Sequence, residues 1–309
     1  MRVVYWGTPE FAEPPLRALL GEGFDVVGVV TQPDRAQGRS RSELVPSPVK
    51  TVAHAEEIPV LQPERPRGPE FVAALRELAP DLSVVVAYGH ILPRDVIDLP
   101  RQGTLNIHAS LLPALRGAAP IQAAIREGFT ETGITIMRMV EALDAGPVVH
   151  RATVPILPDE TYGELQLRLA ELGAQTLIEA LALIEAGAAG EQAQDDSRAT
   201  FAPKVTRDMA RIDWTRPADE VARVIRAYDP KPGAWTTLRD AETRLFGARV
   251  IADRPGEPGQ VLEIDKQGML VAAAGGAVLV SIAQVAGKRR LAPHELLAGR
   301  QIAPRDVLR

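Results

Sequence analysis

The sequence predicts an α/β protein with an open, mostly parallel sheet, followed by a second and smaller β-domain. Strand and helix patterns alternate over the first 189 residues, five short strand patterns lie toward the carboxyl terminus, and a patternless polar stretch separates the two regions. The length of 309 residues suits two domains better than one core. We therefore expect a Rossmann-like domain at 1–189, a linker at 190–206 and an OB-like β-barrel domain at 207–309.

Hydrophobic periodicity predicts the elements of the first domain. Apolar runs predict strands at 3–7, 25–31, 82–88, 104–108, 133–140 and 147–156. Helical patterns occupy 9–23, 69–79, 119–128 and 160–187, and the first of these helices should end at Gly21 or Gly23. The first turn, WGTPEF, lacks the glycines that bring backbone close to a pyrophosphate, so we expect no nicotinamide or flavin cofactor.

The linker and the second domain are predicted from a change of pattern after the last of these helices. Residues 187–204 are small and polar without periodicity. A helix is expected at 215–230, because Pro217 lies near its start and apolar residues follow at helical spacing. Strands with glycine-containing turns follow at 234–240, 243–251, 259–265, 268–274 and 277–287. Five short strands suit a small OB-like barrel, a scaffold that often binds nucleic acids.

Composition excludes several kinds of site. The chain has no cysteine, which excludes disulfides and thiolate chemistry, and its five histidines show no metal-ligand spacing. No basic leader precedes an apolar stretch, and no run of 18 apolar residues occurs, so we expect a cytoplasmic protein.

The net charge of −5 is unevenly distributed along the chain. From residue 201 onward 18 Lys and Arg stand against 13 Asp and Glu, which leaves 17 basic and 27 acidic residues before that point. This asymmetry indicates that the carboxyl-terminal part meets a polyanion, although an ordinary solvated surface explains it equally well.

Three polar residues form the candidate catalytic site. In the strand GTLNIH, alternation places Asn106 and His108 on one face, and they emerge where ligands bind to such sheets, at the carboxyl end of a strand. Asp144 follows a later strand, in LDAG. A carboxamide and an imidazole can together stabilise the negative charge that forms when a nucleophile adds to a carbonyl. Taken singly, the imidazole could be a core residue and the carboxylate a solvated loop residue.

Beyond these residues, longer segments carry a resemblance that covers nearly the whole chain. They are VVYWGTPEFA, TQPDRAQGR, VPSPVK, VVVAYGHILP, SLLPALRGAAPIQ, ETGITIM, LDAG and ARIDW. With them the sequence resembles the methionyl-tRNA formyltransferases, within the wider family of enzymes that transfer a formyl group from 10-formyltetrahydrofolate. The departures are small: Ala109 stands where Gly is common, and Ala145 where Thr is frequent.

The resemblance implies that the amine of methionine on initiator tRNA attacks the formyl carbon of the folate. Asn106 would donate to the formyl oxygen, and a protonated His108 would add a second, charged donor. Asp144 would hold His108 in its cationic form and could accept the amine's proton through a water. The folate would be a co-substrate, with no metal, and we expect a monomer without membrane contact.

The resemblance also implies binding residues. The folate is expected to contact the turn Ser110, Leu111, Leu112 and Pro113, while Ile91, Leu92 and the Met139–Asp144 loop would line a pterin slot. Core packing is an equally good reading of Ile91 and Leu92. For tRNA the candidates are Arg39 and Arg41 in a loop rich in Gly, Ser and Pro, and then Lys204, Arg207, Lys288, Arg289 and Arg290. Any of these cations could instead be a solvated surface charge.

Other functions remain open on the residues alone. The same three groups serve enzymes that formylate a purine-precursor amine or a nucleotide-sugar amine, and a hydrolase that releases formate is chemically close. A non-catalytic RNA-binding module on the same fold is a further alternative. An assay of formyl transfer with and without charged initiator tRNA separates these four.

Overall fold

The computed structural model describes residues 1–37 and 43–309, which form two compact units. Unit 1 comprises Met1–Pro120, Thr132–Val154 and Gln166–Ala202. Unit 2 comprises Ile121–Glu131, Pro155–Leu165 and Pro203–Arg309. Unit 1 thus includes residues beyond position 190, where the linker is predicted to begin, and the predicted domain limits themselves stay a prediction.

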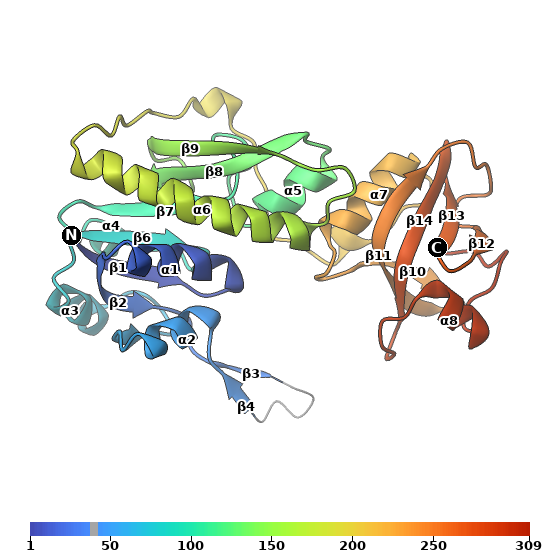
Figure 1. The fold of residues 1–309 in the computed structure, drawn as a ribbon, viewed down its shortest axis with the longest axis horizontal. Coiled ribbons are helices and arrows are strands. Elements are labelled where there is room, and N and C mark those ends of the chain that lie inside the picture. Colours follow the sequence, from blue (N-terminus) through green and yellow to red (C-terminus); the bar gives the residue numbers. More distant parts are fainter. Residues whose placement is uncertain (38–42) are drawn as a thin grey trace. The chain divides into compact units, whose positions relative to one another are not determined.

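Unit 1 is built on a seven-stranded sheet with the order β5-β2-β1-β6-β7-β8-β9 (Figure 1). The strands β1, β2, β5, β6 and β7 pair in parallel, and β8 pairs with β7 in the antiparallel direction. The prediction of an open, mostly parallel sheet is confirmed. The bounds are β1 Arg2–Gly7, β2 Asp25–Val30, β5 Val60–Leu61, β6 Leu82–Val86, β7 Thr104–His108, β8 Glu131–Arg138 and β9 Val148–Pro155.

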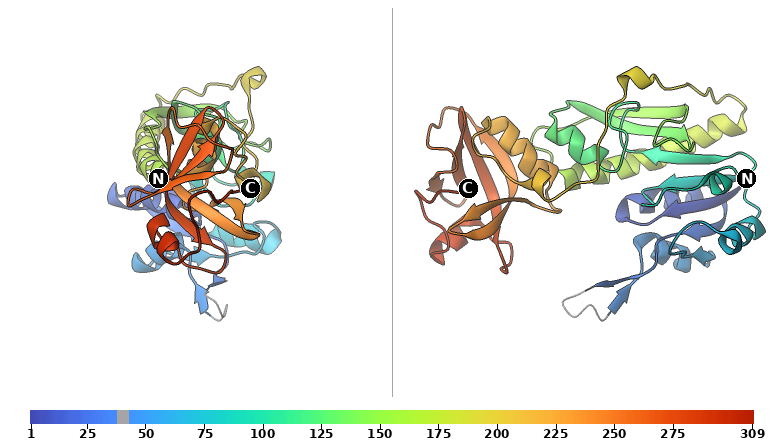
Figure 2. Two further views of the ribbon diagram at one scale, coloured as in Figure 1. Left: turned by 90° about the vertical axis from the view of Figure 1, so that its right-hand side faces the viewer. Right: turned by 180° about the vertical axis from the view of Figure 1, so that it is seen from behind.

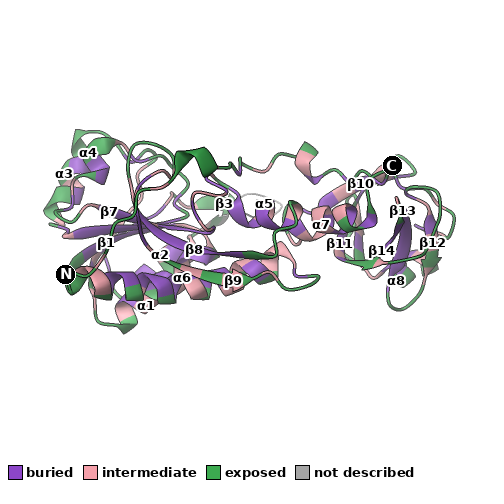
Figure 3. Cartoon of the chain, turned by 90° about the horizontal axis from the view of Figure 1, so that it is seen from above, coloured by how far each residue is buried: buried purple, intermediate pink, exposed green. Residues whose placement is uncertain are grey.

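Burial explains why these segments form central strands. All five residues of β6 are buried, and so are the last five residues of β1. A parallel strand covered on both faces reads as an apolar run rather than as an alternating pattern, as the sequence LSVVV does. Figure 3 shows buried residues along β1 and its neighbour strands and on one side of helices such as α1 and α6.

The helices α1, α3 and α6 lie where the sequence predicts them, and α1 ends at Gly21. Helices α2 and α4 and a small hairpin are not predicted. Helix α2 begins with a proline at its first position. The hydroxyl of Ser47 caps it by accepting a hydrogen bond from Lys50 N at 3.1 Å. The bounds are α1 Glu13–Gly21, α2 Pro48–Ala55, α3 Pro69–Glu77, α4 Arg94–Ile97, α6 Tyr162–Glu185, β3 Arg35–Gln37 and β4 Glu43–Val45.

Unit 2 contains a five-stranded antiparallel sheet of order β10-β11-β14-β13-β12, seen from two further sides in Figure 2. The carboxyl terminus closes this sheet, because Leu308 bridges to Leu238 on one edge strand and Val307 bridges to Gln260 beside the other. The predicted barrel of five strands is confirmed. The bounds are β10 Ala234–Leu238, β11 Ala241–Ile251, β12 Val261–Ile264, β13 Met269–Ala273, β14 Gly276–Val285, α5 Pro120–Arg126, α7 Ala218–Ala227 and α8 Pro293–Ala298.

Asp229, which follows α7, is a half-buried carboxylate. Its Oδ2 accepts a hydrogen bond from Gly247 N at 2.8 Å. Burial raises the pKa of Asp229, against the opposing effects of that hydrogen bond and of the Arg290 charge, and Glu164 adds a small further rise. A raised carboxyl pKa means that the folded state binds its proton more readily than the unfolded chain does. This group therefore adds to stability at low pH, and that contribution is lost as the pH rises through the folded pKa.

We expect Asp229→Asn to raise the unfolding temperature at neutral pH, because the amide oxygen still accepts from Gly247 N while the desolvated charge is gone. The gain should shrink as the pH falls and the wild-type carboxyl takes up its proton. Thermal unfolding across a pH series measures this. Asp213→Asn is the matched control with the opposite sign, since hydrogen bonds from Thr215 lower the pKa of Asp213 and its charge favours folding. A lower unfolding temperature for Asp229→Asn at neutral pH would contradict the assignment.

Within the described residues, no helix is both long enough and apolar enough to cross a membrane.

Candidate active site

Strand β7 carries Asn106 and His108 at its carboxyl-terminal end. Asn106 pairs with Val85 of β6 and with Met137 of β8, and His108 pairs with Thr135 of β8. Both side chains leave the same face of the strand, as alternation predicts. His108 is buried and Asn106 half-buried, so the imidazole is shielded from solvent while the carboxamide remains accessible.

The loop after β7 is fixed to β8 through Thr135. The Thr135 hydroxyl donates to the Ser110 carbonyl at 2.7 Å and accepts from Leu112 N at 3.2 Å. The Ser110 hydroxyl donates to the Ala114 carbonyl at 2.6 Å, which holds the turn closed. The loop is thereby positioned to contact His108.

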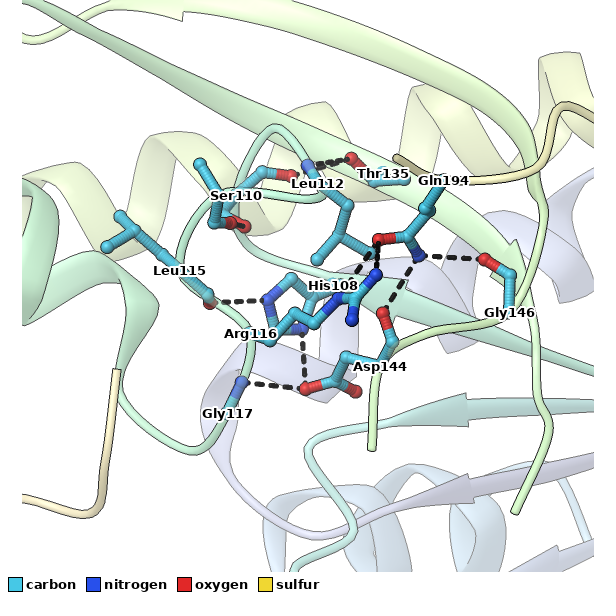
Figure 4. Close-up of polar contacts among 11 residues, drawn as sticks. His108, Ser110, Leu112, Leu115, Arg116, Gly117, Thr135, Asp144, Gly146 and Gln194 are labelled. Atoms are coloured by element: carbon cyan, nitrogen blue, oxygen red, sulfur yellow. Dashed lines mark hydrogen bonds and ion pairs between the residues drawn. The ribbon is translucent and has the colours of Figure 1, made fainter. Parts of the chain in front are cut away.

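His108 lies between two acceptors (Figure 4). Its Nε2 is 3.0 Å from the Leu115 carbonyl, and its Nδ1 is 3.7 Å from Asp144 Oδ2. Asp144 lies in the loop between β8 and β9, and the same Oδ2 accepts a hydrogen bond from Gly117 N at 2.8 Å. The structure thus brings together two of the three predicted catalytic residues, and the Gly117 N–H bonds to the carboxylate oxygen that faces the ring.

The two contacts of the His108 ring differ in what they require of its nitrogens. A carbonyl oxygen only accepts, so Nε2 must carry a hydrogen to bond with Leu115. A neutral ring would then present the Nδ1 lone pair to the Asp144 carboxylate, whereas a protonated ring faces both acceptors with N–H groups. The separation of 3.7 Å is longer than a hydrogen bond and is that of an ion pair when the ring is protonated.

Asn106 is the third candidate catalytic residue, and its carboxamide N–H groups are available to a bound molecule. Among the hydrogen bonds within residues 1–37 and 43–309, none involves the Asn106 carboxamide. A half-buried amide without an internal partner can donate to a carbonyl oxygen of a bound molecule. The described residues hold no group of three or more His, Asp or Glu side chains that could bind a metal ion.

Two polar residues beside Asp144 are missed by the sequence analysis. The buried Arg116 donates to the Gln194 carboxamide oxygen, and the Gln194 amide donates to the backbone carbonyls of Asp144 and Gly146 (Figure 4). The only signal for Arg116 is a single cation inside the otherwise apolar run ALRGAAP. Gln194 has no signal, because it lies in the patternless stretch.

The candidate folate residues differ in how far they are buried. Leu92 is 2% exposed and packs in the core with Val96 and Ile97, whereas Ile91 is 84% exposed. Ser110 and Leu112 are buried, and Leu111 and Pro113 are half-buried. Leu92 thus packs in the core, and folate binding by all six residues stays a prediction.

The candidate tRNA residues differ in how they are held. Arg39 and Arg41 lie outside the described residues. Lys204, Lys288 and Arg289 are exposed. Arg290 lies over the Phe246 ring at 3.7 Å and donates to a backbone carbonyl.

Trp235 is an aromatic group that the sequence analysis does not single out. Arg207 lies 4.8 Å from the Trp235 ring and pairs with Glu242 at 2.6 Å, and Arg211 lies 5.6 Å from the same ring. Cations over a half-exposed aromatic ring suit contact with nucleotides.

Comparison with known proteins finds matches over most of the chain. Residues 1–181 match the family described as Formyl transferase, and residues 204–301 match Formyl transferase, C-terminal domain. Methionyl-tRNA formyltransferase of Geobacter sulfurreducens is 45% identical over 98% of this chain and 95% of that protein. The protein of the same name from Stutzerimonas stutzeri is 47% identical over 100% of this chain and 98% of its own length.

Solved structures share the fold at lower identity. Methionyl-tRNA formyltransferase from Clostridium thermocellum has a TM-score of 0.58 at 11% identity, covering 92% of this chain and 98% of that one. WlaRD, a sugar 3N-formyl transferase, has a TM-score of 0.70 at 16% identity, covering 94% and 99%. These likenesses show the fold alone. The relatives of higher identity span nearly the whole chain, and it therefore belongs to the methionyl-tRNA formyltransferase family.

Proposed function

We propose that this chain transfers a formyl group from 10-formyltetrahydrofolate to the amino group of methionine on initiator methionyl-tRNA, forming N-formylmethionyl-tRNA for translation initiation. The observation that carries the proposal is the contact of His108 with Asp144 beside Asn106, in a chain 45% identical to a methionyl-tRNA formyltransferase.

The residues present fit a formyl donor. A formyl group offers one carbonyl oxygen, which needs a hydrogen-bond donor, and the carboxamide of Asn106 can supply it beside His108. When bound, the folate supplies a formyl group whose bond to the folate nitrogen breaks as the bond to the methionine nitrogen forms, with one proton passing from the amine to the released folate.

The chain's own groups act on charge and orientation. Asn106 donates to the carbonyl oxygen and stabilises the negative charge that develops there. Protonated His108 adds a nearby positive charge rather than a second donor, because both of its N–H groups face Leu115 and Asp144. Asp144 orients the imidazole and stabilises its positive charge. Through a water, the Asp144 carboxylate can also accept the proton that the amine loses.

Mass measurement of methionyl-tRNA after incubation with the protein and 10-formyltetrahydrofolate tests the proposal. We expect a formyl adduct on the initiator species and none on elongator methionyl-tRNA. Release of formate without tRNA would instead indicate a hydrolase, and formylation of a sugar or purine-precursor amine would indicate one of the related transferases.

Replacement of both Arg39 and Arg41 by Ala should weaken use of tRNA and flatten its salt dependence, because each lost phosphate contact reduces the number of counterions released on binding. Affinity for the folate should not change. Binding of charged initiator tRNA across a salt series measures the effect. Arg65 and Arg67 are the matched control pair, since they are exposed and have the same spacing in the sequence. An unchanged salt slope in the Arg39 and Arg41 variant would count against the assignment.

We further propose that the enzyme acts as a monomer in the cytoplasm. The supporting argument is chemical: both substrates are soluble, and the three candidate catalytic residues come from one chain. Light scattering of the purified protein tests the oligomeric state.

A further inference from the structure

Residues 192–202, within the stretch predicted as a linker, pair first with β9 and then, at 200–202, with the loop that follows β7. Arg116 N donates to the Thr200 carbonyl at 2.9 Å, and Ala202 N donates to the Arg116 carbonyl at 2.7 Å. The Thr200 hydroxyl accepts from Leu115 N at 2.9 Å. Leu115 is the residue whose carbonyl bonds with the His108 ring. The segment is thus paired with the loop that contacts His108, in the manner of an added strand.

The same segment inserts one side chain, Gln194, between a buried cation and the Asp144 loop. Arg116 is 6% exposed, and its Nε and Nη2 atoms donate to Gln194 Oε1 at 3.1 and 2.8 Å. Nη2 also donates to Asp196 Oδ1 at 2.7 Å. The bonds to Oε1 fix the orientation of the amide, because a guanidinium donates and never accepts. The Gln194 NH₂ group must then point away from Arg116.

That NH₂ group uses both of its hydrogens on the loop that carries Asp144 (Figure 4). Gln194 Nε2 donates to the Asp144 carbonyl at 2.8 Å and to the Gly146 carbonyl at 2.7 Å. One side chain therefore holds the carbonyls of the two residues that flank Ala145. Because both ends of the Gln194 carboxamide are satisfied, this partly buried network leaves little freedom for the loop.

The backbone here needs such support. Asp144 has a φ of 48°, in the left-handed region that costs energy for a residue with a side chain. Gly146 has no room for a side chain, since an added Cβ would lie 1.8 Å from the Arg138 carbonyl oxygen. A left-handed residue persists where its surroundings fix it, and its conformation sets the direction of the Asp144 carboxylate toward His108.

We propose that Gln194 is a positioning residue for the reaction: oriented by Arg116, it holds the Asp144 loop so that the carboxylate faces the His108 ring. This inference rests on the proposed function, because the two residues whose contact Gln194 maintains are the proposed catalytic pair, His108 and Asp144. It extends the machinery to a part of the chain outside the predicted catalytic domain.

The test is Gln194→Glu, which is equal in size and keeps an oxygen for Arg116 but replaces the donor to the two carbonyls by a second acceptor. We expect kcat to fall by up to about 100-fold, as displacement of a catalytic group by roughly an ångström can cause, with KM for both substrates nearly unchanged. The matched control is Gln192→Glu, the same substitution at an exposed side chain two residues earlier, which should retain wild-type kcat. Thermal unfolding of both variants shows whether the fold is kept.

Two further measurements separate positioning from general structural damage. In a double-mutant cycle with Asp144→Asn, the effect of Gln194→Glu on kcat should nearly vanish, because a residue that acts through Asp144 has nothing left to position. Selective isotope labelling of histidine should show changed ring-nitrogen NMR shifts for His108 in Gln194→Glu and unchanged shifts in Gln192→Glu. Full additivity in the cycle, or an unchanged His108 signal, would overturn the inference.

Failure of the inference and failure of the proposed function give different results. If wild-type protein forms no formyl adduct on initiator methionyl-tRNA, the proposed function is wrong. If the wild type forms the adduct and Gln194→Glu matches Gln192→Glu in kcat, only the positioning role is wrong.

Discussion

Asn106→Ala is expected to lower kcat by about 100- to 1000-fold while the affinity for the folate changes little, as for removal of one donor to a developing oxyanion. The carboxamide has no partner among the described residues, so its deletion leaves no buried group unsatisfied and should not harm the fold. The lost interaction is strongest when negative charge develops on the formyl oxygen. Its removal therefore affects the transition state more than the bound ground state.

The composition of the chain makes this prediction unusually direct to measure. Asn106 is the only asparagine among the 309 residues, so selective labelling of asparagine amides gives a single side-chain NMR signal. That signal should shift when the folate binds, and steady-state kinetics give the loss in kcat. The control is Thr104→Val, two residues earlier on the same face of β7, where the lost hydroxyl donates to the Ile97 carbonyl instead of the site. Equal losses in affinity and turnover would make Asn106 a residue that positions the ligand.

Most of the fold is predictable from the sequence, because buried segments have a recognisable hydrophobic pattern. Strands covered on both faces appear as apolar runs, and the barrel strands are separated by turn glycines. Asn106 and His108 were predictable because a strand's alternation puts two polar groups together at the end of an apolar run. The closure of the barrel by Val307 and Leu308 was not predictable, because the terminal segment that forms these two bridges is too short to show a periodic pattern.

Side-chain environment was less predictable than fold. Ile91 and Leu92 are adjacent apolar residues, yet Ile91 is exposed and Leu92 packs in the core. An irregular loop has no hydrophobic periodicity from which this difference could be predicted. Gln194 lies fifty residues from Asp144 in a stretch without pattern, and only the folded chain shows that its amide reaches the Asp144 loop. The candidate catalytic residues are encoded locally, whereas the group that supports them is not.

Asp144→Asn should also lower kcat strongly, on the order of 10- to 100-fold, because a hydrogen bond or ion pair to a charged group contributes about 1.5–3 kcal/mol. The substitution is conservative in shape, and the amide oxygen can still accept from Gly117 N. What is lost is the negative charge facing His108 Nδ1, at 3.7 Å in the wild type. Asp196→Asn is the matched control, since that carboxylate accepts from Arg116 but is 80% exposed and should leave kcat nearly unchanged.

The background in which Asp144→Asn is measured decides between the two roles of the carboxylate. If Asp144 acts by orienting and charging the imidazole, then Asp144→Asn should cause little further loss in a His108→Ala background, because the partner is already gone. If it accepts the amine's proton, its loss should persist there, since that role does not pass through the ring. We expect the first result, because the imidazole lies between two acceptors and only its protonated form has a hydrogen for each. A persistent loss in the double variant would assign the proton transfer to Asp144.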